Sequence, residues 1–126
     1  MVLADTSVWI RFLANREPYA GGLDRLLARD EVAGHDFVYG ELLIGDRGGR
    51  RKILSAYQAI RQVRTVPHVE VVEFVRDRKL HGRGAGWIDI HLLASVIVEG
   101  LHLWTADARL HSMAAELGIA YGPGGF

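Results

Sequence analysis

Cysteine is absent from this sequence of 126 residues, and proline is scarce, with three in the whole chain. Without cysteine the protein has neither a disulfide framework nor a thiolate metal site, and it is compatible with a reducing compartment. His91 is the only histidine close in sequence to the acidic residues discussed below. A structural zinc site is therefore not expected either.

Long hydrophobic runs are missing as well. The longest candidate, HLLASVIV, ends at Glu99 and is far shorter than the roughly 20 apolar residues that a membrane span needs. A secretory signal needs a basic start and an uninterrupted apolar core, whereas Asp5 and Arg11 interrupt the first apolar run. We therefore expect a cytoplasmic protein that makes no membrane contact.

Net charge of one sign is the third feature that the composition lacks, because 15 Lys and Arg balance 15 Asp and Glu. Apolar residues make up 49% and charged residues 24%, which is typical of a soluble globular protein. At this length we expect one domain over residues 1–126, with a flexible tail at 122–126. The even balance conceals a basic middle segment, residues 47–83, whose only acids are Glu70, Glu73 and Asp77.

Short apolar segments alternate along the chain with segments of helical spacing. The predicted strands are residues 2–5, 32–35, 101–105 and 119–121. The predicted helices are residues 7–14, 19–29, 37–45, 50–64, 71–80, 88–99 and 108–117. Asp36 is the expected N-cap of the third of these helices. The alternation predicts an α/β fold, a three-layer α/β/α sandwich with a mainly parallel central sheet.

Four acidic residues occupy equivalent places in this pattern. Asp5 and Asp107 lie at or just past the end of a predicted strand, and Glu41 and Asp89 lie in the first turns of predicted helices. In a parallel sheet the strand ends and the helix starts gather at the same edge, where ligands bind. We therefore expect these four carboxylates to converge.

Crowded carboxylates repel one another, and burying each without a partner costs several kcal/mol, as an order of magnitude. The basic side chains near these positions are Arg11 and Arg109 at most. Hard divalent cations bind oxygen ligands, so Mg²⁺ or Mn²⁺ is the expected compensation. Such a site suits phosphodiester hydrolysis, in which metal ions activate water and stabilise the attacking and leaving oxygens.

Two other interpretations of the acids stay open. Each acid could be a helix cap or a first-turn residue, because the helix dipole favours negative charge there. A phosphoacceptor signalling module also gathers aspartates at strand ends around magnesium. It normally has a lysine at that edge, whereas this chain has only Lys52 and Lys79, both in predicted helices of the middle segment.

The motifs that hold these acids resemble those of one family. LADTSVW, FVYGELLIG, GRGAGWIDIHLLAS and LWTADARL together resemble the PIN-domain ribonucleases and, among them, the VapC toxins of bacterial toxin–antitoxin pairs. The resemblance implies a PIN-like fold and an endoribonuclease dependent on Mg²⁺ or Mn²⁺. It also implies a VapB-type antitoxin as partner and RNA as substrate. We further expect a homodimer. A catalytically inactive PIN domain kept for binding is the alternative within the family.

The resemblance also implies roles for individual residues. Asp5, Glu41, Asp89 and Asp107 would form the catalytic acidic site, with Asp5, Asp89 and Asp107 as metal ligands. Ser7 and Thr105 correspond to small hydroxyl residues that orient the acids. The stretch VYG before Glu41 departs from the more usual pattern with Ser or Thr, which leaves the four acids intact.

Several other residues have both a functional and a structural interpretation. Four arginines of the basic segment could contact RNA or could form a solvated helix face: Arg50, Arg51, Arg61 and Arg64. Trp87 and Trp104 could stack on a base, but we expect them to pack in the core. His91 could transfer a proton, but we expect a structural role.

Overall fold

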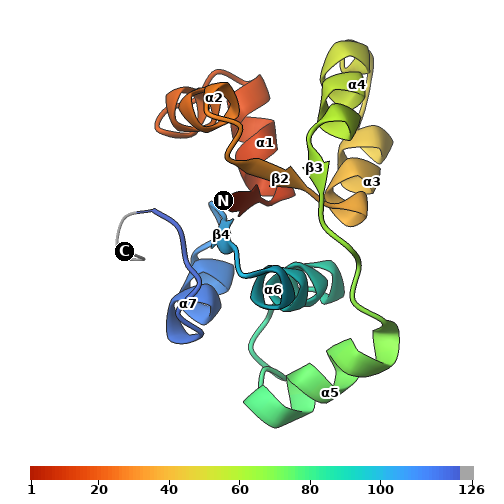
Figure 1. Ribbon diagram of the computed structural model, residues 1–126, viewed down its shortest axis with the longest axis vertical. Helices are drawn as coiled ribbons and strands as arrows, with labels where there is room; N and C mark the ends of the chain where they lie inside the picture. The colour runs from red at the N-terminus through yellow and green to blue at the C-terminus, as the bar shows by residue number, and fades with distance from the viewer. Residues whose placement is uncertain (123–126) are drawn as a thin grey trace.

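The computed structural model describes residues 1–122, which form four strands and seven helices (Figure 1). Of the predicted flexible tail, 122–126, all but Gly122 lies outside the described residues. Among residues 1–122, no helix combines the length and the apolar character needed to cross a membrane.

The four strands form one parallel sheet in the order β3-β2-β1-β4. Its members are β1 (Val2–Ala4), β2 (Val32–Gly34), β3 (Arg61–Gln62) and β4 (His102–Trp104). In the centre of the sheet, Leu3 of β1 pairs in register with Ala33 of β2 and Leu103 of β4, and all three are fully buried. The prediction of a mainly parallel central sheet is confirmed.

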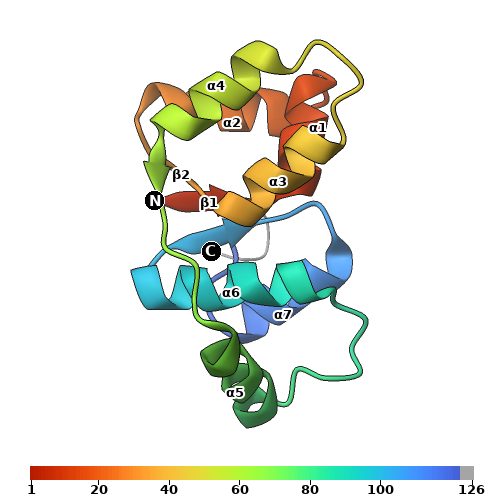
Figure 2. The ribbon, with the colours of Figure 1, turned by 90° about the vertical axis from the view of Figure 1, so that its right-hand side faces the viewer.

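Helices cover both faces of this sheet (Figure 2). The helices on one face are α1 (Thr6–Leu13), α2 (Tyr19–Ala28), α3 (Asp36–Ile44) and α4 (Arg51–Ala59). The helices on the other face are α6 (Trp87–Glu99) and α7 (Ala108–Glu116), with α5 (His68–Arg78) outside α6. Because α6 packs between the sheet and α5, its residues Ile90 to Val96 are all buried, as its all-round apolar sequence predicts.

The prediction of one helix over residues 50–64 is wrong. Helix α4 ends at Ala59, the backbone of Ile60 is extended, and Arg61 and Gln62 form the edge strand β3. This strand pairs with Ala33 and Gly34 of β2, and both of its side chains are exposed. A two-residue strand with exposed side chains shows no hydrophobic alternation that would predict it. The helical spacing of Ile60 and Val63 therefore led to the prediction of a continuous helix.

Two smaller predictions also need correction. Asp36 is the first residue of α3 and not its cap; the N-cap is His35, whose Nδ1 accepts a hydrogen bond of 3.0 Å from Phe37 N. Residues 119–121 do not form a strand, because only Ala120 makes an isolated parallel bridge, to Leu103. The capping hydrogen bond is local, but the His35 imidazole that makes it is also hydrogen-bonded to Ser95, 60 positions away, and local spacing does not encode that contact.

Candidate active site

Asp5 lies directly after β1, at the carboxyl edge of the sheet, and is 4% exposed. It is the N-cap of α1, because its Oδ1 accepts a hydrogen bond from Val8 N at 3.2 Å. The same carboxylate accepts hydrogen bonds of 2.5 Å from Ser7 to Oδ1 and from Thr105 to Oδ2. The capping interpretation is therefore correct for one oxygen, but it does not account for the two hydroxyl groups that hold the carboxylate.

Ser7 and Thr105 connect β1 to the loop after β4. Ser7 Oγ donates to Asp5 and accepts a hydrogen bond of 2.9 Å from Ala106 N. Thr105 Oγ1 donates to Asp5 and accepts a hydrogen bond of 3.0 Å from Asp107 N. The two hydroxyls thus orient one acid while they fix the backbone that carries another.

Asp107 follows β4 and is the N-cap of α7. Its Oδ1 accepts a hydrogen bond of 3.0 Å from Leu110 N, and the residue is exposed. The cap uses one carboxylate oxygen only. The exposure of the residue leaves it accessible to an incoming ion.

Glu41 lies in the middle of α3, and its side chain is tied to the start of α1. Thr6 Oγ1 donates a hydrogen bond of 2.6 Å to Glu41 Oε1. Sequence reasoning missed Thr6, although its position directly after Asp5 placed its hydroxyl at the same edge of the sheet. The contact brings a residue of α3 to the carboxyl end of β1.

Asp89 lies in the first turn of α6 and is half-buried. Burial raises the pKa of its carboxyl, and the charges of Asp5, Glu41 and Asp107 raise that pKa further. Charges act on a pKa only over a limited range, so the carboxylates of these three residues lie in the neighbourhood of Asp89. The structure therefore brings the four predicted acids together at the carboxyl edge.

Burial also raises the pKa of the Asp5 carboxyl, in spite of the hydrogen bonds from Ser7 and Thr105 that favour its charged form. None of the four acids has a cationic partner among residues 1–122, where the ion pairs join Arg61 and Arg64 to Glu99 and Arg83 to Glu116. The negative charge of the cluster is therefore uncompensated by the described part of the chain. Oxygen donors with this charge are the ligands that Mg²⁺ and Mn²⁺ prefer.

Within residues 1–122, no three histidine, aspartate or glutamate side chains are already arranged as ligands of one ion. The fit with a hard divalent cation therefore rests on the donor set and its uncompensated charge. Lys52 and Lys79, the lysines that a phosphoacceptor module could use, lie in α4 and at the C-cap of α5. Neither element contributes an acid to the cluster.

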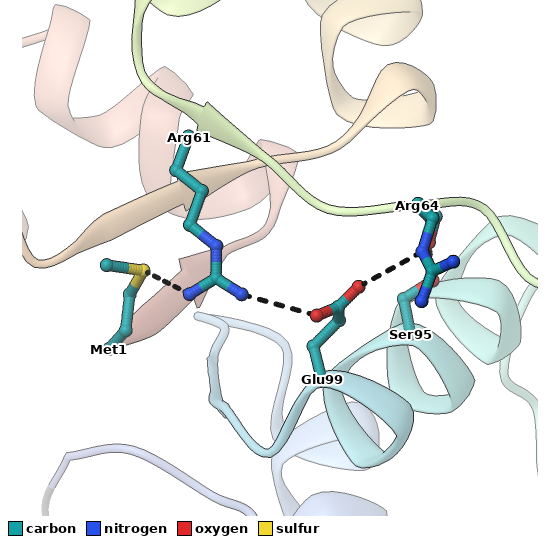
Figure 3. A network of polar contacts seen from close by, with 5 residues as sticks. All are labelled: Met1, Arg61, Arg64, Ser95 and Glu99. Atoms are coloured by element: carbon teal, nitrogen blue, oxygen red, sulfur yellow. Dashed lines mark hydrogen bonds and ion pairs between the residues drawn. The ribbon is translucent and has the colours of Figure 1, made fainter.

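The four arginines considered for RNA contact lie in different surroundings. Arg50 is half-buried and donates a hydrogen bond of 2.8 Å to the carbonyl of Leu42, whereas Arg51 is exposed at the start of α4. Arg61 and Arg64 flank Glu99, with contacts of 3.2 and 3.8 Å (Figure 3). Glu99 is the last residue of α6 and Asp89 lies in its first turn, so these two arginines belong to the opposite end of the helix.

The aromatic residues near the acids also differ from one another. Trp104 is buried, as predicted, but Trp87 is 43% exposed, so the prediction that it packs in the core is wrong. His91 is buried between Phe37 and Trp87, with both rings edge-on to the imidazole, and its Nδ1 has no hydrogen-bond partner within the described residues. Trp87 is the first residue of α6, and its ring lies edge-on to His68 of α5, with centroids 5.4 Å apart.

Comparison with known proteins identifies the family of this chain. The family model described as PIN domain matches residues 2–116. The chain is 41% identical over 121 residues to Ribonuclease VapC32 from two strains of Mycobacterium tuberculosis, CDC 1551 / Oshkosh and ATCC 25618 / H37Rv, with 95% of each chain covered.

A structural likeness extends to PAE2754 from Pyrobaculum aerophilum, whose crystal structure covers 88% of this chain, with 82% of that chain matched. The TM-score is 0.57 and the sequence identity 18%, so this likeness concerns the fold alone. The family match over nearly the whole chain and the identity to VapC32 have the same implication. The chain belongs to the PIN-domain family and, within it, to the VapC ribonucleases.

Proposed function

We propose that this protein is the toxin of a VapBC-type toxin–antitoxin pair and that it hydrolyses RNA phosphodiester bonds with Mg²⁺ or Mn²⁺. The relatives with 41% identity are named ribonucleases, which supports the reaction class. The observation that carries the proposal for the site is the convergence of Asp5, Glu41, Asp89 and Asp107 without a cationic partner in the described chain. Helix capping alone does not require such a convergence.

Asp5, Asp89 and Asp107 are the residues that would hold the ion in this proposal. A bound divalent ion would polarise the phosphate, lower the pKa of a coordinated water and stabilise the charge that develops in the transition state. The raised pKa values of Asp5 and Asp89 mean that both carboxyls bind protons more readily in the metal-free fold than in solution. Metal binding therefore displaces protons and becomes tighter as the pH rises.

The hydroxyl groups keep the acids in one orientation. Ser7 and Thr105 hold both oxygens of Asp5, so that carboxylate cannot rotate without losing a hydrogen bond. Thr6 binds Oε1 of Glu41 and leaves Oε2 for the attacking water, whose proton Glu41 would accept. The chain thus supplies orientation and a general base, and the phosphodiester would be cleaved with a 5′-phosphate on the product if water attacks in line with the 3′-oxygen as leaving group.

A toxin of this kind needs an inhibitor, and we propose a VapB-type antitoxin that covers the acidic cluster with a basic or bulky side chain. Exposed apolar residues beside the cluster are available for contact with a protein partner. Ile44 of α3 is 89% exposed and Leu43 51%, and Trp87 of α6 lies in the same surface pocket as Ile44 and Glu41. The same apolar surface could support a homodimer, which we propose as the assembly of the free toxin.

Cleavage of total bacterial RNA by antitoxin-free protein tests the proposal, with Mg²⁺ or with EDTA and beside Asp5→Asn. Discrete fragments that need both the metal and Asp5 are expected. The matched control is Asp24→Asn, which removes an exposed carboxylate from α2 and should cleave normally. Fragments that persist in EDTA or in folded Asp5→Asn would contradict the site, and Mn²⁺ binding without any fragments would indicate an inactive binding domain instead.

A further inference from the structure

A second concave site adjoins the acidic cluster on the side of α2 and α7. It is a surface pocket of about 500 Å³, and we call it the aromatic pocket because three of its lining residues are Tyr19, Trp104 and Tyr121. This volume lies within the range typical of small-molecule sites. The proposed hydrolysis at the four acids leaves the pocket without a role.

Contacts among the three aromatic rings hold this side of the pocket in place. The rings of Tyr19 and Trp104 are stacked, with centroids 5.7 Å apart and an angle of 30° between the planes, and Tyr121 lies 5.2 Å from Trp104 on a tilted plane. Gly22 lets α2 approach the indole closely, because a Cβ at this position would lie 2.8 Å from the ring of Trp104. Trp104 is anchored in β4 and 7% exposed, whereas the two tyrosines are half-buried.

The polar lining has a definite character. Arg25 of α2 and His111 of α7 line the pocket, and among its lining residues Asp107 is the single acid. Arg11 lies over the ring of Tyr19, with its guanidinium carbon 5.7 Å from the centroid, and donates to the carbonyl of Ser7. Flat aromatic surface beside cationic groups fits a planar heterocycle that is attached to a phosphate.

The pocket and the acidic cluster share residues. Thr105 and Asp107 line the pocket, while the Thr105 hydroxyl donates a hydrogen bond to Asp5 and accepts one from Asp107 N. A ligand in the pocket is therefore in direct continuity with a phosphate bound at the acids. This continuity favours a part of the RNA substrate over a free metabolite as the occupant of the pocket.

We propose that the aromatic pocket binds one unpaired base of the RNA substrate, in a nucleotide next to the phosphodiester bond that is cut. The inference rests on the proposed ribonuclease function and extends it to the choice of cleavage position. Single-stranded RNA is recognised by stacking of splayed bases on aromatic side chains. Tyr121 supplies the stacking surface, and Tyr19, whose ring is stacked on Trp104 and lies under Arg11, contributes the edge of its ring. Arg25 and His111 face the base edge or its phosphate, and Trp104 forms the rigid wall behind them.

The first test measures binding without turnover. Adenosine, guanosine, cytidine and uridine 5′-monophosphates are titrated in EDTA into the full chain, and the indole N–H resonances of the three tryptophans are followed by NMR. Substitutions Trp87→Phe and Trp104→Phe assign the signals. We expect a saturable shift of the Trp104 signal for at least one nucleotide, and none for Trp9, which lies in the core against Phe12 and Tyr57.

Matched variants test whether the nucleotide binds in the aromatic pocket. Arg25→Ala and Tyr19→Leu should each weaken nucleotide binding on the order of tenfold, the effect expected for loss of one stacking or cationic contact. Arg29→Ala at the C-cap of the same helix and Tyr39→Leu on α3 change residues outside the pocket lining, and both variants should bind normally. If the control variants lose as much nucleotide affinity as the pocket variants, at unchanged melting temperature, the proposal is overturned.

The second test measures cleavage of short RNAs that carry every base on each side of the cut. Wild type should prefer a base at one flanking position, and Arg25→Ala and Tyr19→Leu should flatten that preference, with the remaining cleavage still dependent on the metal. Cleavage without any nucleotide shift at Trp104 overturns the pocket and leaves the ribonuclease intact. Nucleotide binding at Trp104 without any cleavage of RNA would overturn the ribonuclease proposal and leave the pocket as a nucleotide site. Pocket variants that weaken only antitoxin binding would assign the pocket to the protein partner.

Discussion

The hydroxyl of Thr105 donates a hydrogen bond of 2.5 Å to Oδ2 of Asp5, so two residues 100 positions apart share one carboxylate. The contact runs from the end of β4 to the end of β1, whose strands are neighbours in the parallel sheet. Because Thr105 also accepts from Asp107 N, the bond sets the position of a second acid. The pairing of β1 with β4 therefore sets the relative positions of Asp5 and Asp107 in the acidic cluster.

Removal of the orienting hydroxyls should reduce activity more than stability. For Thr105→Val and Ser7→Ala we expect cleavage to fall by a factor of about 10 to 100, the range typical for partners that orient metal ligands. The physical reason is that Asp5 would lose a fixed orientation. Rates are compared with Thr65→Val and Ser55→Ala, which remove exposed hydroxyls elsewhere. Normal rates in both Asp5-contacting variants would contradict the orienting role.

Loss of one acid should stabilise the metal-free fold. In Asp89→Asn the repulsion from Asp5, Glu41 and Asp107 disappears, so we expect the free energy of unfolding in EDTA near neutral pH to rise by roughly 0.5 kcal/mol. The same variant should lose the increase in melting temperature that Mn²⁺ gives the wild type. Asp77→Asn, an exposed acid of α5, should show neither effect. Destabilisation of Asp89→Asn in EDTA would indicate a structural role for the carboxylate.

The pH dependence of stability should contain a contribution from His35. Burial lowers the pKa of His35 from 6.5 to about 4, and its Nδ1 must be unprotonated to accept from Phe37 N. The folded state therefore binds fewer protons than the unfolded state between these values. His35 stabilises the fold above about pH 6.5, and we expect this contribution, roughly 2 to 3 kcal/mol, to be lost as the pH falls toward 4.

Urea unfolding of wild type and His35→Asn at several pH values checks this expectation, because asparagine keeps an acceptor for the helix cap. The difference in unfolding free energy between the two proteins should shrink from pH 7 to pH 4.5. Asp5 and Asp89 act in the opposite sense in metal-free protein, since their raised pKa values make stability fall as pH rises through the window just above 3.8. A pH-independent difference would exclude His35 as the titrating group.

The arginines around Glu99 should matter little for catalysis. Arg61 and Arg64 are 48% and 89% exposed at the side chain, and pairs of this kind contribute less than about 1 kcal/mol. For Arg61→Ala and Arg64→Ala we expect cleavage within about twofold of wild type, because both residues lie at the end of α6 remote from Asp89. A tenfold loss in either variant, with unchanged melting temperature, would restore them as RNA contacts.

Much of the fold was predictable because its signals are local. The apolar strands around Leu3, Ala33 and Leu103 are bounded by turns and alternate with helices, which defines a parallel α/β sandwich. The convergence of the acids followed from that topology. The edge strand β3 was not predictable, because two exposed residues carry no period and only the pairing with Gly34 makes them a strand.

The sequence by itself determined the order of strands and helices and, to within about one residue, where each central strand ends and the following helix begins, since strand length and hydrophobic spacing are encoded within a few neighbouring positions. The tertiary structure decided which side chains meet: Thr6 with Glu41, Thr105 with Asp5, and Tyr19 with Trp104. These pairs are distant in the chain and come together only when the core packs. Orientation at the acidic cluster and the aromatic pocket are for that reason properties of the folded molecule.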